Sequence, residues 1–168
     1  MMKPRIWLRI AAGLQAFGTV GHSLATLNPK PAHGAPEQAV FDAMRGFQFD
    51  IMGSTRSTWD FYRGYQFSTT VTFVLTAVLL WLLGNMSSSA PREAKPLVLA
   101  LLIAQLFNVA IGWKFFFAGP GVVGSLIAIC LTMAMVGLYR PERPAPCRST
   151  LSQRIGKSSL YKEINHRD

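Results

Sequence analysis

Four polar side chains recur along an otherwise apolar stretch near the N-terminus of this 168-residue chain: Gln15, Thr19, His22 and Thr26. Their spacings of four, three and four residues place them on one face of an α-helix. Polar groups face hydrocarbon only at a high cost, so such a face points into a helix bundle. There it either joins neighbouring helices, which is the simpler interpretation, or lines a semi-polar cavity.

His22 is the strongest single candidate, because imidazole titrates near neutral pH and an ionisable group in an apolar helix predicts a functional site. The competing interpretation is a histidine near a helix end that only bonds to a backbone carbonyl. A metal site is disfavoured, since His33 lies in a Pro/Gly-containing loop and His166 lies in a distant polar tail. We therefore expect no metal, and no haem or other cofactor.

A second polar stripe lies on a later apolar stretch, where Gln105, Asn108 and Gly112 share one helical face. Lys114 follows near the end of that stretch. The same pattern occurs on the stretch before it: Thr69, Thr72 and Thr76. As with the first stripe, helix packing and a cavity lining are both consistent with this spacing.

The segment from residue 56 to 65 is dense in groups that bind ligands. Arg56, Asp60 and Arg63 are three or four residues apart, so on a helix they form a ladder of ion pairs. The aromatic residues between them suit a membrane interface: Trp59, Tyr62 and Tyr65. Alternatively, Arg63 and Lys114 hold an anionic headgroup above an apolar pocket lined by residues 115–117.

Half of the residues are hydrophobic, which is too apolar for an ordinary soluble domain. Four segments are long enough to cross a membrane as helices: residues 10–27, 67–83, 97–117 and 122–139. We interpret the first as a retained span and not as a cleaved signal peptide, because no clear small-residue cleavage site follows it. The sequence thus predicts an all-α, four-helix membrane bundle in residues 1–140 and a basic, disordered cytoplasmic tail in residues 141–168.

Residues that end or cap helices separate these segments. Residues 28–31 follow the first segment, Gly84 and Asn85 follow the second, and Pro96 precedes the third. Residues 118–121 leave room only for a tight turn, so the third and fourth helices must be antiparallel neighbours.

The segment between the first two spans, residues 28–66, is more than a linker. Apolar residues recur in it at helical spacing, with charged residues between them: Phe41, Met44, Phe47 or Gln48, and Ile51. This pattern predicts an outer amphipathic helix that lies on or caps the bundle.

The formal net charge is +9, and the basic residues cluster outside the apolar segments, with Lys114 near the end of the third segment as the exception. With both ends of the chain on one side, twelve of the 17 Lys and Arg residues lie on that side. The positive-inside rule therefore places the N- and C-termini in the cytoplasm and favours a bacterial inner membrane. The absence of a basic and aromatic stripe disfavours nucleic acid as a partner.

Two short motifs carry a resemblance. The sequence GTVGH at residues 18–22 ends the first span, and WDFYRG at residues 59–64 leads into the second, with two more spans following. This pattern resembles uncharacterised small bacterial four-span membrane proteins similar to the DoxX-like group, over roughly residues 8–138. The resemblance implies a four-helix bundle in the inner membrane and supplies no catalytic residue.

These patterns lead to three hypotheses about function. In the preferred one, the outer half of the bundle binds a small lipophilic molecule, such as a lipid or a quinone. The candidate residues are Gln15, Thr19, His22, Asp60, Arg63, Gln105, Asn108 and Lys114. In the second, the protein is a structural or accessory subunit, or a homo-oligomer, that pairs through small residues of the last span such as Gly121 and Gly124. In the third, a membrane enzyme uses His22 as acid or base with Asp60, although common enzyme motifs are absent.

Overall fold

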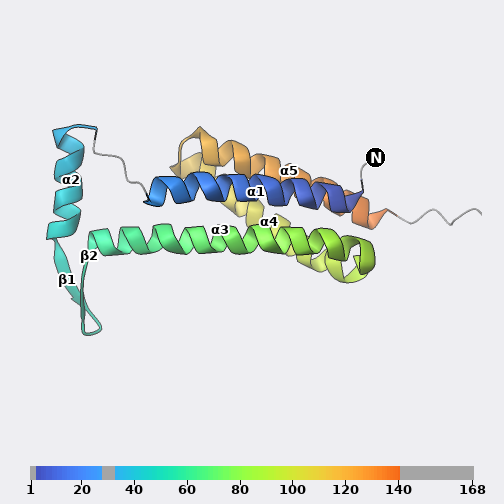
Figure 1. The fold of residues 1–168 in the computed structure, drawn as a ribbon, viewed down its shortest axis with the longest axis horizontal. Helices are drawn as coiled ribbons and strands as arrows, with labels where there is room; N and C mark the ends of the chain where they lie inside the picture. Colours follow the sequence, from blue (N-terminus) through green and yellow to red (C-terminus); the bar gives the residue numbers. More distant parts are fainter. Residues whose placement is uncertain (1–2, 28–32, 141–168) are drawn as a thin grey trace, which may run out of the picture.

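The computed structural model describes residues 3–27 and 33–140, which form five helices and one small hairpin (Figure 1). The helices are α1 (Pro4–Leu27), α2 (Ala35–Gly46), α3 (Thr58–Ser89), α4 (Pro91–Phe115) and α5 (Ala118–Tyr139). The strands β1 (Gln48–Ile51) and β2 (Ser54–Ser57) pair antiparallel between α2 and α3. The all-α prediction is confirmed, while the predicted disordered tail lies outside the described residues.

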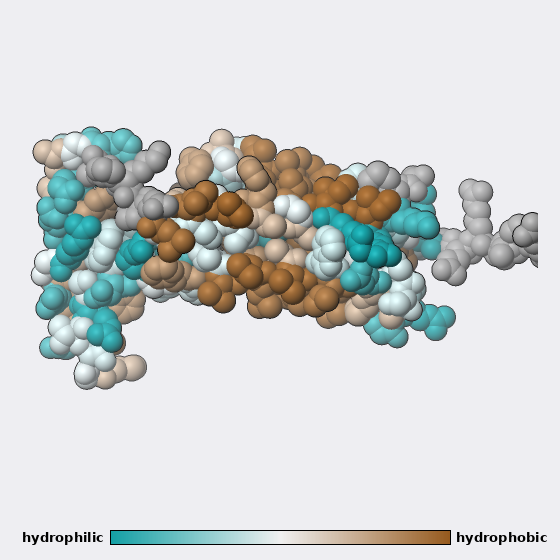
Figure 2. Space-filling view, in the orientation of Figure 1, coloured by the Kyte–Doolittle hydropathy of each residue, from teal (hydrophilic) through white to brown (hydrophobic). Residues whose placement is uncertain are grey.

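Three helices, α3, α4 and α5, are long and apolar enough to cross a membrane. Figure 2 shows apolar surface along the middle of the long helices and hydrophilic surface at both ends of the molecule. These features mark the chain as a membrane protein. In α1, which has 24 residues, the apolar sequence is interrupted by the basic residues Arg5 and Arg9 and by the polar stripe, and α1 is not among the three.

The four long helices pack in a defined order. α1 lies between α3 and α5, and α4 packs along α5 (Figure 1). Only Ala90 separates α3 from α4, and only residues 116 and 117 separate α4 from α5. The predicted antiparallel pairing of the last two helices is therefore confirmed, but the turn is displaced: residues 118–121, which were predicted to form it, are the first turn of α5.

The apolar core occupies one half of this bundle. It combines the start of α1, the end of α3, the start of α4 and the end of α5: Leu8, Ala11, Ala12, Leu80, Leu83, Ala94, Val98, Ile127, Cys130, Leu131, Ala134 and Leu138. In the other half of α1, the buried residues are Gln15, Thr19 and Thr26. The half that faces the hairpin is therefore built around polar groups.

Two further predicted helix boundaries are wrong. α3 continues through Gly84 and Asn85 to Ser89, and Gly84 packs against the start of α1 instead of ending the helix. A Cβ atom on Gly84 would lie 3.4 Å from Cγ of Arg9. Pro96 lies inside α4, since a proline near a helix start removes one backbone bond without ending the helix when neighbouring helices support it.

The outer segment also differs from its predicted form. A helix is present, but α2 ends at Gly46, and β1 replaces the predicted helical continuation to Ile51. Met52 and Gly53 form the hairpin turn with φ angles of +49° and +80°. Two left-handed residues match the twist of a two-residue hairpin, so this turn favours a strand pair over a helix. Phe41 of α2 packs against Trp59 of α3, with ring centroids 5.6 Å apart.

Candidate functional site

A group of four residues joins the end of α1 to the beginning of α3, and we call it the polar cluster: His22, Thr26, Arg63 and Gln66. Nε2 of His22 lies 3.1 Å from the backbone oxygen of Gln66 and 3.5 Å from Oγ1 of Thr26. Nη1 of Arg63 donates to the backbone oxygen of Thr26 at 2.6 Å and to Oε1 of Gln66 at 3.2 Å. Both ionisable side chains therefore bridge the two helices.

The bond to Gln66 fixes the roles of the two ring nitrogens of His22. A carbonyl oxygen can only accept a hydrogen bond, so Nε2 must carry the hydrogen. In the neutral ring Nδ1 then holds a lone pair, and no residue of the described chain hydrogen-bonds to it. His22 thus makes the carbonyl contact of the simpler interpretation and also keeps one acceptor for a ligand.

Arg63 has a structural role at the end of α1. The last carbonyl groups of a helix lack intrahelical partners and carry partial negative charge. α1 has no basic residue in its last turn, and Arg63 supplies the missing cation from α3. Its guanidinium also lies 4.8 Å from the ring centroid of Phe67. The bonds given above use Nη1 alone, so the hydrogens on Nε and Nη2 can serve another acceptor.

The remaining members of the first stripe also lie on the inward side of α1. Gln15 and Thr19 are buried, and Oγ1 of Thr19 donates to the backbone oxygen of Gln15 at 2.7 Å. The ring of His22 packs against Phe73 of α3, with centroids 5.5 Å apart. The α1 face predicted from spacing is therefore turned toward α3 and the bundle, and an aromatic ring borders its histidine.

Asp60 caps α3. Its Oδ2 accepts from the backbone nitrogen of Ser57 at 2.8 Å, while Oγ of Ser57 accepts from the backbone nitrogen of Asp60 at 3.2 Å. This reciprocal arrangement is a capping box. No hydrogen bond in the described residues joins Asp60 to His22, so the geometry gives no support to that pair as acid and base.

The three candidate residues on α4 make no described hydrogen bond to the polar cluster. Nε2 of Gln105 donates to the backbone oxygen of Gly124 at 3.0 Å and thereby joins α4 to α5. Asn108 is exposed and donates to the backbone oxygen of Ala104 within its own helix. Lys114 is exposed as well. Of the eight candidate residues, only His22 and Arg63 belong to the described polar cluster, which they form through Thr26 and Gln66.

Two other predicted features have a different setting. The phenylalanines at 115, 116 and 117 are 69%, 61% and 77% exposed, so they form exposed apolar surface at the α4–α5 turn, where a pocket wall was predicted. The small residues of α5 face α4 of the same chain. A Cβ atom on Gly121 would lie 2.8 Å from the ring of Trp113, which shows how closely the two helices approach.

Sequence reasoning missed Gln66, which supplies two acceptors to the cluster. Its position could have indicated this role, because Gln66 lies three residues after Arg63 on the same helical face and directly before the apolar segment 67–83. Sequence reasoning also missed a groove of about 330 Å³ on a different face of α3. Arg56 of β2 borders this groove, and the other lining residues share one face of α3: Asp60, Phe61, Gly64, Tyr65 and Ser68.

No model of a known protein family matches this sequence, and neither curated proteins nor solved structures give a match. The resemblance to DoxX-like proteins stays a prediction from two short motifs. The residues that the structure describes hold no group of three His, Cys, Asp or Glu side chains able to bind a metal ion. Ideas about function therefore rest on the geometry of the polar cluster.

Proposed function

We propose that the protein is a four-span protein of a bacterial inner membrane that binds a small lipophilic molecule with a polar head at the polar cluster. In this proposal α1 is the fourth span. Its 24 residues extend about 36 Å, which exceeds the roughly 30 Å of a hydrocarbon core. Packing between α3 and α5 supports this assignment, because a helix flanked by neighbours tolerates polar residues that a lipid-facing helix would not.

The proposed orientation has both chain ends in the cytoplasm. Arg5 and Arg9 at the start of α1 lie beside Asn85 near the end of α3, and Arg92 follows at the start of α4. This basic end is the one that the positive-inside rule assigns to the cytoplasm. The polar cluster and the hairpin then lie toward the outer surface, where a ligand enters from the outer leaflet.

The observation that carries the proposal is the incomplete use of hydrogen-bonding groups in the polar cluster. His22 has a free acceptor in Nδ1, and Arg63 has further donors on Nε and Nη2. Aromatic rings of Phe67 and Phe73 border these groups. An acceptor and a cationic donor beside apolar rings suit a head that offers a hydroxyl to Nδ1 of His22 and an oxygen acceptor to Arg63. A quinol has two hydroxyls for these roles and an acylglycerol has a hydroxyl and an ester carbonyl, whereas a quinone offers acceptors to Arg63 only.

Native mass spectrometry with lipid and quinone analysis tests this proposal on protein purified in mild detergent. The informative variants are His22→Gln and His22→Ala. The glutamine amide keeps a donor near the position of Nε2 but offers nothing at Nδ1. A defined small molecule that wild type retains, and that both variants lose while His22→Gln keeps its thermal stability, supports the proposal.

Two results would refute it. Full retention of the molecule by His22→Gln would show that His22 only links α1 to α3 by a hydrogen bond and does not bind the molecule. Bulk phospholipid alone in the wild type would leave no ligand for the cluster to bind, and crosslinking for a partner subunit would then be the better experiment.

A further inference from the structure

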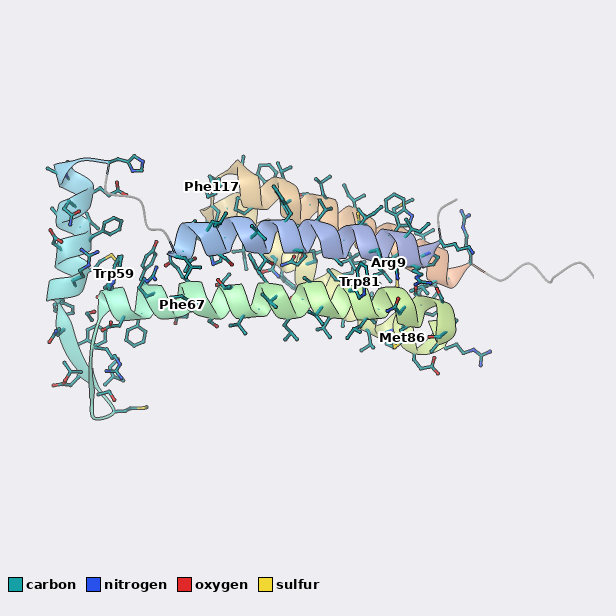
Figure 3. All side chains as sticks on the ribbon, in the orientation of Figure 1. Arg9, Trp59, Phe67, Trp81, Met86 and Phe117 are labelled. Carbon is teal, nitrogen blue, oxygen red and sulfur yellow. The ribbon has the colours of Figure 1, made fainter. Side chains whose placement is uncertain are left out.

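A second cluster of cationic side chains lies at the opposite end of α1. Arg5 and Arg9 are one helical turn apart, and their Nη2 atoms lie 3.3 Å and 3.2 Å from the same oxygen, Oδ1 of Asn85 on α3. The guanidinium carbon of Arg9 is 4.6 Å from the ring centroid of Trp81. Figure 3 shows Arg9 and Trp81 side by side where α1 and α3 pack together.

The charges of this cluster are not balanced by the described residues. Two guanidinium groups share one neutral oxygen, and the Nε atoms of both are buried without a hydrogen-bond partner. The first turn of α1 contains no acidic residue, and the positive end of the helix dipole adds to the same field. The ion pairs of the described chain, His33 with Glu37 and Asp42 with Arg45, both lie in the outer segment.

We propose that Arg5, Arg9 and Asn85 form a binding site for the phosphodiester headgroup of an anionic phospholipid. The two unesterified oxygens of a phosphate carry negative charge and can each accept hydrogen bonds from a guanidinium group. The side chain of Asn85 offers the two arginines only one neutral acceptor oxygen. The negative charge of a bound phosphate offsets the repulsion between Arg5 and Arg9, two like charges four residues apart on one helix.

The surroundings favour a lipid over a soluble anion. The site lies next to the apolar surfaces of α1 and α3, and Trp81 is 50% exposed beside it, as is typical of a headgroup interface. Basic sites between membrane helices bind anionic headgroups in this way. A zwitterionic lipid brings a phosphate together with a cation, which the two arginines would repel. This site is at the other end of α1 from the polar cluster and does not depend on the function proposed above.

The decisive variant is Asn85→Asp, because it places a carboxylate where Oδ1 contacts both arginines. We would reconstitute the protein in nanodiscs of phosphatidylcholine with and without phosphatidylglycerol, and measure thermal unfolding and lipid retention. Wild type should unfold at a higher temperature with phosphatidylglycerol and retain it. Asn85→Asp should be more stable than wild type in phosphatidylcholine alone and should retain at least about tenfold less phosphatidylglycerol.

Arg92→Gln is the matched control, since Arg92 is an exposed cation near the same end of the bundle. It should keep the wild-type response, whereas Arg5→Gln combined with Arg9→Gln should lose it. An equal loss in Arg92→Gln would show general attraction to negative charge and overturn the site. An undiminished response in Asn85→Asp would overturn it independently of whether the arginine variants fold. Equal stabilisation by inorganic phosphate in an uncharged detergent would overturn its assignment to a lipid.

Discussion

Replacing Arg63 by methionine should loosen the last turn of α1, although Arg63 belongs to α3. Nη1 of Arg63 donates to the backbone oxygen of the buried Thr26 at 2.6 Å. A hydrogen bond that involves a charged group contributes about 1.5 to 3 kcal/mol. A cation at a helix C-terminus adds about 0.3 to 1 kcal/mol. Since Arg63 is half-buried and water reaches part of the site, we expect a loss of about 2 kcal/mol.

Hydrogen exchange of the backbone amides in the last turn of α1 measures this loss directly. Local opening that becomes easier by about 2 kcal/mol raises the exchange rate roughly 30-fold. Arg63→Lys should give an intermediate rate, because lysine keeps the charge but cannot reproduce the planar donor geometry.

Arg45→Met is the control for loss of an outer positive charge. Arg45 forms a surface ion pair with Asp42, and such pairs contribute little. If exchange in α1 rises equally in Arg45→Met and Arg63→Met, or rises in neither, then Arg63 does not cap α1. The account of the polar cluster as a bridge between two helices would then be wrong.

Three further predictions concern other elements. Met52→Asn should stabilise the hairpin by about 1 kcal/mol, because asparagine tolerates the left-handed φ of +49° better than methionine does; amide exchange in β1 and β2 would reveal it, and Met52→Ala should show no gain. Gly84→Leu should lower the unfolding temperature in detergent, since a side chain there meets Cγ of Arg9 on α1, and an unchanged temperature would contradict the close approach of α1 and α3. The hydrogen bond from the backbone nitrogen of His33 lowers the pKa of Glu37, so its stabilising effect should be complete above the ordinary carboxyl pKa and should vanish as pH falls through the lower folded value. An acid titration of the His33 amide by NMR should show this transition in wild type, and its persistence in Glu37→Gln would contradict the assignment.

The sequence alone determined which segments are apolar helices and which face of α1 is polar. Both properties are local, because hydropathy and a repeat of three or four residues depend only on the chain itself. The close antiparallel packing of α4 and α5 followed from the short segment between them. The histidine–carbonyl contact was anticipated as an alternative for His22, although its partner was not.

The tertiary structure decided which groups meet. Gln66 became the partner of His22, and Arg63 the cap of α1, only because α1 packs against the beginning of α3. Gly84 lies within α3 and packs against α1, so its position in the bundle also depends on the neighbouring helix. Asn108 carries the same amide group as Gln105 and lies three residues after it on the same predicted helical face, yet of these two only Gln105 hydrogen-bonds to α5. Spacing along a helix tells which side chains share a face, but the direction of that face depends on the neighbouring helices, which no local pattern contains.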